Sequence, residues 1–98
     1  MRSLLILNPK DNVAIALTDL RAGQAIEQDG RSLIALEDIP AGHKLALTEI
    51  ASGECVVKYG EEIGRAKALI RQGAHAHVHN IIDITEEVVT EERRRLGL

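Results

Sequence analysis

Three of the four histidines in the chain fall within five residues, at His75, His77 and His79. In a β-strand successive side chains point to opposite faces, so an alternating run of histidines would line one face. Imidazole is the commonest metal-binding side chain, and its charge changes near neutral pH. This spacing therefore predicts a chemical site in which the imidazoles bind a metal ion or transfer a proton.

The same spacing limits what one straight strand can do. Alternate residues lie about 6.6–6.8 Å apart, which would separate His75 from His79 by roughly 13 Å. Because bonds to a metal ion are about 2.1 Å long, we expect two neighbouring histidines to share an ion unless a bend brings in the third. The remaining ligands would come from elsewhere in the chain, from a partner or from substrate oxygens. Alternatively, the histidines form a polar sheet face at a partner interface.

Three further residues supply basic groups that such a site would use. His43 and Lys44 follow a glycine turn, much as His75 follows another, so His43 joins the histidines if the two turns approach in space. Lys44 or Lys58 would then offer the positive charge that a carboxylate substrate needs. The alternative for either lysine is a solvated position on a strand.

The segments around these residues predict short strands joined by tight turns. A motif of one aliphatic residue followed three positions later by glycine occurs at residues 20–23, 39–42, 50–53 and 70–73. Glycine adopts positive φ at no steric cost, so each motif indicates a turn anchored by a buried aliphatic side chain. The strand-like segments, rich in aliphatic or β-branched residues, are residues 4–7, 13–17, 32–36, 44–47 and 54–59.

Other segments complete the expected fold. Asp29 and Gly30 favour a hairpin turn, and residues 48–52 and 65–71 are expected to form single helical turns. Residues 85–96 predict a helix, with Thr85 as N-cap, glutamates in its first turn and arginines in its last. Its apolar stripe is thin, which favours a solvated or partner-docked helix. We expect a compact, mainly β domain over residues 1–84, with a charged helical tail over residues 85–98.

Composition narrows the class of protein. The 98 residues make one small domain, and a net charge of −3 with a single aromatic residue disfavours nucleic-acid binding. The single cysteine, Cys55, excludes an internal disulfide and suits a reducing cytoplasm. The apolar run at residues 4–7 is too short for a signal peptide or a membrane span. We expect a cytoplasmic protein without a nucleic-acid or membrane partner.

Five sequence fragments occur in the chain in one order. They are Asp11-Asn-Val-Ala-Ile-Ala-Leu17, Gly42-His-Lys-Leu-Ala-Leu47, Val57-Lys-Tyr-Gly60, Ile63-Gly64 and Gly73…His75-x-His77-x-His79-Asn80. Together they resemble the N-terminal domain of altronate and galactarate dehydratases, a member of the SAF (β-clip) group. The resemblance covers about residues 8–80, and five fragments in order are far more specific than any one alone.

The resemblance implies a lyase that removes water from a sugar acid such as altronate or galactarate, using a divalent metal, iron or manganese. The related sulfolactate sulfo-lyase has separate small and large subunits, and in the fused dehydratases a larger catalytic domain follows the SAF domain. Because the chain ends at Leu98, we expect either a separate large catalytic subunit as partner or a fragment of a fused enzyme. The chain alone is expected to be inactive.

Specific residues receive roles on this interpretation. The candidate metal ligands are His75, His77 and His79, of which the last two are also candidate catalytic residues. The candidate substrate-binding residues are His43, Lys44, Lys58, Asp11 and Asn12. Asp11 and Asn12 have an alternative, because short polar side chains in a turn bind their own backbone. The base that removes the α-proton is expected in the large partner.

Two alternatives belong to other functional classes. The chain would be a non-catalytic β-clip module that binds a small acid or a metal ion, or an architectural subunit that caps a partner through its sheet edge and charged tail. Self-association into a homo-oligomer is compatible with each of these. Co-purification with a much larger protein would favour the lyase.

Overall fold

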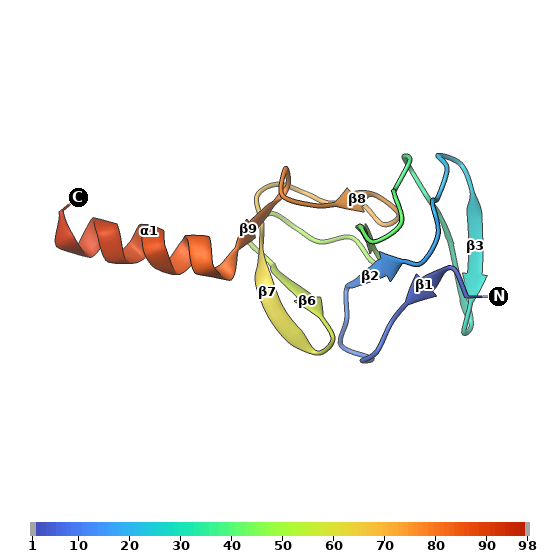
Figure 1. The fold of residues 1–98 in the computed structure, drawn as a ribbon, viewed down its shortest axis with the longest axis horizontal. Helices are drawn as coiled ribbons and strands as arrows, with labels where there is room; N and C mark the ends of the chain where they lie inside the picture. The colour runs from blue at the N-terminus through green and yellow to red at the C-terminus, as the bar shows by residue number, and fades with distance from the viewer. Residues whose placement is uncertain (1, 98) are drawn as a thin grey trace.

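The computed structural model describes residues 2–97, and within the C-terminal helix it describes the side chains of residues 89 and 91–96. Short strands dominate, so the mainly β fold predicted from the sequence is confirmed (Figure 1). The elements are β1 (Leu4–Leu5), β2 (Val13–Ala16), β3 (Ala25–Gln28), β4 (Arg31–Ile34), β5 (Lys44–Ala46), β6 (Cys55–Lys58), β7 (Glu61–Ala66), β8 (His75–Ala76), β9 (Ile81–Asp83) and α1 (Ile84–Leu96).

The described strands form three small antiparallel sheets. One has the order β1-β2-β5-β8, the second is the β3-β4 hairpin, and the third has the order β6-β7-β9. In the first sheet β5 pairs with β8, so that Leu45 lies opposite His75 and Lys44 lies opposite Ala76. This register places the first residue of β5, Lys44, beside the last residue of β8, Ala76.

The four glycine turns anchor the fold as predicted. Each of the four glycines has φ between +85° and +87°, the region that favours glycine. The aliphatic residues three positions earlier, Leu20, Ile39, Ile50 and Ile70, are at most 1% exposed. Leu20 pairs with Ile39, and Ile50 pairs with Ile70, through isolated antiparallel bridges. Each pair closes the base of one hairpin, β3-β4 or β6-β7.

The hydrogen bonds reveal two similar halves. The N–H of Gly42 donates to the carbonyl of Ala16 at the end of β2, and the N–H of Gly73 donates to that of Ala46 at the end of β5. Each half has its own buried apolar cluster. The second and fourth glycine turns therefore occupy equivalent places in the two halves, and each leads into a strand of the same sheet.

The prediction of single helical turns at residues 48–52 and 65–71 is wrong. Residues 65 and 66 belong to β7, and Ile50 and Ile70 exchange two backbone hydrogen bonds of 2.8 Å. These backbone groups pair between the two segments and cannot close a local helical turn. The structure also contains β3, β7 and β9, which the strand-like segments in the sequence did not include.

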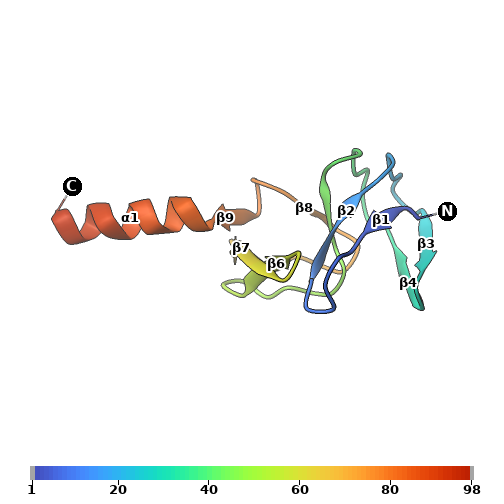
Figure 2. The same cartoon turned by 60° about the horizontal axis from the view of Figure 1, so that its bottom comes forward.

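The C-terminal helix is confirmed. It begins at Ile84, so the predicted N-cap, Thr85, lies inside it. The helix continues from β9 and projects away from the sheets (Figure 1, Figure 2). Val89 and Leu96 are 51% and 61% exposed, as expected from the thin apolar stripe. Within the described residues, no helix is both long enough and apolar enough to cross a membrane.

Candidate functional site

The predicted arrangement of three histidines along one straight strand is wrong. Strand β8 ends at Ala76, and residues 77–80 turn back, with the carbonyl of His77 accepting hydrogen bonds from the N–H groups of Asn80 and Ile81. As a result, the ring centroids of His75 and His79 lie 5.3 Å apart. The turn after β8, rather than one continuous strand, therefore brings the side chains of His75, His77 and His79 close together.

His43 joins these histidines from the residue before β5. The second and fourth glycine turns lie at opposite ends of the antiparallel β5-β8 pair, so an approach of the two turns is not what brings it there. The register instead sets Lys44 opposite Ala76, which places His43 beside His77. His43 stacks on His77 with ring centroids 4.3 Å apart, and its Nδ1 atom lies 2.9 Å from Nε2 of His75. One ring nitrogen from each of these three residues lies within 4.8 Å of the other two. We call His43, His75 and His77 the histidine cluster; His79 lies outside it.

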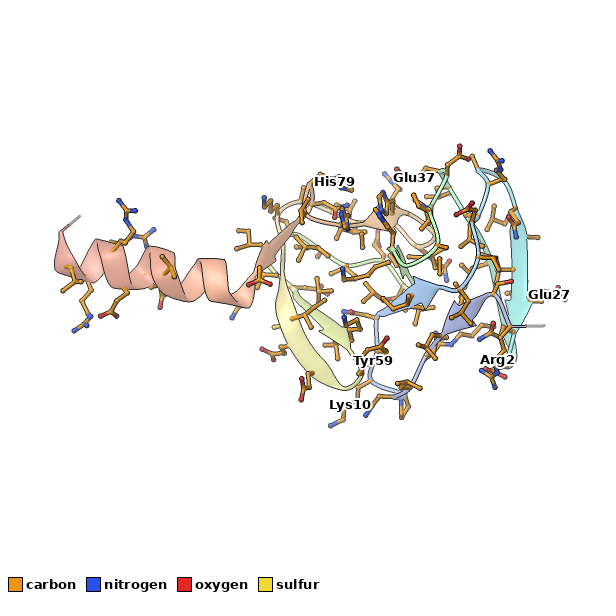
Figure 3. The ribbon with its side chains drawn as sticks, in the orientation of Figure 1. Arg2, Lys10, Glu27, Glu37, Tyr59 and His79 are labelled. Carbon is orange, nitrogen blue, oxygen red and sulfur yellow. The ribbon has the colours of Figure 1, made fainter. Side chains whose placement is uncertain are left out.

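Two residues to which the sequence gives no role hold the cluster in place. The side-chain oxygen of Asn80 accepts a hydrogen bond from the His77 N–H, and its amide group donates to the His75 carbonyl, both at 2.9 Å. The Glu37 carboxylate accepts a hydrogen bond from the His75 N–H at 3.1 Å. Asparagine is a turn former, which is a usable signal for Asn80, whereas nothing local indicates Glu37. Figure 3 shows Glu37 and His79 along the same edge of the domain.

The surroundings of His75 and His77 favour the uncharged form of these two imidazoles. Burial is the main cause that lowers the pKa of both His75 and His77, and the neighbouring His43 lowers each pKa further. Lys44 also lowers the pKa of His77, whereas Glu37 acts in the opposite direction on His75. The Nδ1 atom of His77 is buried and has no hydrogen-bond partner among the described residues. Neutral imidazoles have the lone pairs that a metal ion requires.

The cluster has a donor set that fits a divalent metal ion. Two ligands about 2.1 Å from one ion and at right angles to each other are roughly 3.0 Å apart. The 2.9 Å between the His43 and His75 nitrogens is close to that separation, although a hydrogen bond between two neutral rings has the same length. The buried Nδ1 of His77, which has no hydrogen-bond partner among the described residues, is a further nitrogen that a metal ion could satisfy.

A cavity of about 240 Å³ adjoins the histidine cluster. His77 belongs both to the cluster and to the cavity wall, which Lys44 and Lys58 also line. Burial lowers the pKa of Lys44, and the nearby Lys58 ammonium lowers it further. The residues that line the cavity are Lys44, Lys58, Ile63, His77, Val78, Ile81 and Asp83.

Asp11 and Asn12 have structural contacts and belong to neither the cluster nor the cavity lining. The buried carboxylate of Asp11 accepts a hydrogen bond of 2.7 Å from the N–H of Gly60. The Asn12 side chain donates to the carbonyl of Cys55 and accepts from the N–H of Val57. These bonds tie the loop before β2 to the β6-β7 hairpin. The predicted substrate-binding role of both residues therefore gains no support from their positions.

The lowered pKa values predict that the metal-free domain loses stability as the pH falls. Unfolded histidines have the ordinary pKa of 6.5, so below about pH 6.5 the unfolded chain binds more protons than the folded chain. Urea titrations should therefore give a smaller free energy of unfolding at about pH 5.5 than at about pH 7.5. In His77→Gln the free energy of unfolding should decrease less over the same pH range. A slope identical to that of the wild type would contradict this account of His77.

Comparison with known proteins identifies relatives of this domain. A family model described as the altronate/galactarate dehydratase SAF domain matches residues 2–83. The chain is 49% identical over 70 residues to altronate dehydratase of Escherichia coli (strain K12), and 41% identical over 80 residues to that of Bacillus subtilis (strain 168). These matches cover 71% and 82% of the chain but only 14% and 16% of the two relatives.

A shorter relative is also similar. The alpha subunit of (2R)-sulfolactate sulfo-lyase from Chromohalobacter salexigens is 47% identical over 60 residues, which is 60% of this chain and 64% of that subunit. The chain thus spans less than two thirds of each of these three relatives. The region matched by the family model contains the whole histidine cluster and all the described residues that line the cavity, and it ends before α1.

Proposed function

The chain belongs to the altronate/galactarate dehydratase SAF domain family, and on this basis we propose that it serves a lyase that removes water from a sugar acid. Its part in that enzyme is to bind the acid and a divalent metal ion next to each other. The observation that carries this proposal is the position of the histidine cluster beside a cavity that Lys44 and Lys58 line.

The proposed chemistry divides the imidazoles by role. A divalent ion held by the histidine cluster, iron or manganese, would supply Lewis acidity toward a substrate oxygen. The lowered pKa values of His75 and His77 suit neutral ligands better than proton donors. Loss of water also needs a proton for the departing hydroxyl and a base for the α-proton. We assign the donor to His79, which is exposed beside His75, in preference to His77, and the base to a larger partner.

The larger partner is inferred from the relatives. The chain spans 14% of the Escherichia coli altronate dehydratase, and the sulfo-lyase relative is named as a subunit. The rest of the catalytic machinery would therefore lie in another domain or polypeptide. The expected cytoplasmic location and the capacity for self-association stay predictions.

The proposal predicts activity only in the assembled enzyme. The chain, the larger lyase domain or polypeptide that completes it and their mixture would each be incubated with altronate, galactarate or sulfolactate and with Fe²⁺ or Mn²⁺. We expect elimination products from the mixture and none from either polypeptide alone. Full turnover by the larger polypeptide without this chain would contradict the proposal and favour an architectural role.

A further inference from the structure

We propose that the cavity beside the histidine cluster is an anion subsite in which Lys44 and Lys58 together hold one carboxylate of a small hydroxy acid. The proposed function supplies the identity of that acid, so this inference rests on it. The subsite itself is argued from the cavity, its charges and its position, and it assigns the carboxylate to the two lysines rather than to the histidine cluster.

The cavity has the size and lining of a site for a small acid. Its volume of about 240 Å³ lies below the range of roughly 300–1,000 Å³ typical of sites for drug-sized ligands. Lys44 comes from β5 and Lys58 comes from β6, so two different sheets each contribute one cation. Ile63 and Ile81 supply apolar wall, which suits the C–H faces of a short carbon chain.

The charges in the cavity leave a positive excess that an anion would balance. Lys44 is half-buried, and the structure shows no ion pair for it among the described residues. The ammonium of Lys58 lies 5.0 Å from the centre of the Tyr59 ring, a contact that limits its freedom. Asp83 also lines the cavity, so among the described residues its wall contains one carboxylate and two ammonium groups. A bound carboxylate would relieve the repulsion between the two ammonium groups.

The position of His77 links this subsite to the proposed chemistry. Its ring is part of the cavity wall and also stacks on His43 within the histidine cluster. An acid whose carboxylate lies between Lys44 and Lys58 would therefore direct its adjacent hydroxyl groups toward the cluster. Charge-assisted contacts from lysine fix the anionic end, which orients the remainder of the molecule.

The test measures binding of the acid to the full chain after removal of metal by a chelator. Calorimetric titration with galactarate is compared among the wild type, Lys44→Gln, Lys58→Gln and Lys10→Gln, the last being an exposed lysine on the edge opposite His79 (Figure 3). We expect each cavity variant to bind galactarate about 10- to 100-fold more weakly, and the Lys10 variant to bind it like the wild type. Galactitol, which has the same carbon chain without carboxylates, should not bind.

Several results would overturn the subsite. They are no binding of galactarate by the wild type, wild-type affinity for galactarate in both cavity variants, or binding of galactitol as strong as that of the acid. Circular dichroism would confirm that the variants are folded. The binding assay requires neither metal nor turnover. A failure of the lyase assay would therefore not change a positive result for galactarate binding. If the assembled enzyme turned over its substrate while the Lys44 and Lys58 variants bound galactarate like the wild type, the proposed subsite would be wrong and the proposed lyase function would stand.

Discussion

His43→Ala should strip the divalent metal from the assembled enzyme and reduce turnover by at least about 100-fold, although His43 lies 32 residues from His75 in the sequence. The reason is that His43 supplies one of the three ring nitrogens that lie within 4.8 Å of one another. Loss of an outer contact already costs about 10- to 100-fold in metal affinity, so loss of a direct ligand should cost at least as much. Metal content after dialysis and initial rates measure the two effects.

His79→Ala is the matched control for metal binding. It removes the same side chain from the turn next to the site, but His79 is exposed and lies outside the histidine cluster. We expect this variant to retain its metal while losing turnover, because His79 is the proposed proton donor. If His79→Ala lost the metal and His43→Ala retained it, the histidine cluster would not be the metal site. The metal ligands would then be His75, His77 and His79.

The local features of this site could be predicted from the sequence because they depend on short-range rules. A glycine three positions after an aliphatic residue favours a turn, and the four turns predicted at residues 20–23, 39–42, 50–53 and 70–73 are present. The alternation of His75, His77 and His79 marks the segment that contains β8 and the following turn. What it could not reveal is where the strand ends, because Asn80 bonds back to both His75 and His77.

The composition of the cluster depends on contacts between distant segments. His43 approaches His75 only because β5 pairs with β8. Glu37 contacts the His75 backbone across 38 residues. Conversely, Asp11 and Asn12 occur in a fragment typical of the family, yet their side chains bind the backbone of the β6-β7 hairpin. A fragment shared within a family thus does not separate a structural residue from a substrate-binding one.

Gly73→Ala should destabilise the domain by about 3 kcal/mol or more and should also weaken the histidine cluster. Gly73 has φ +85°, and a Cβ atom there would overlap the carbonyl oxygen of Ile34. Its own carbonyl accepts a hydrogen bond of 2.9 Å from the N–H of Leu36, so the two halves meet at this turn. The backbone would have to shift two residues before His75, which would move that ring relative to His43.

Gly53→Ala separates the overlap from the cost of the turn itself. Gly53 lies in another of the four glycine turns, with φ +86°, but a Cβ atom there would meet nothing within 4 Å. Its substitution should cost only the strain of a left-handed alanine, about 1–2 kcal/mol, and should leave metal affinity unchanged. Urea unfolding of both variants gives the two free energies, and metal titration tests the site. Equal losses of stability would show that the close approach of Gly73 to Ile34 contributes nothing, and that strain alone explains why glycine is required at both positions.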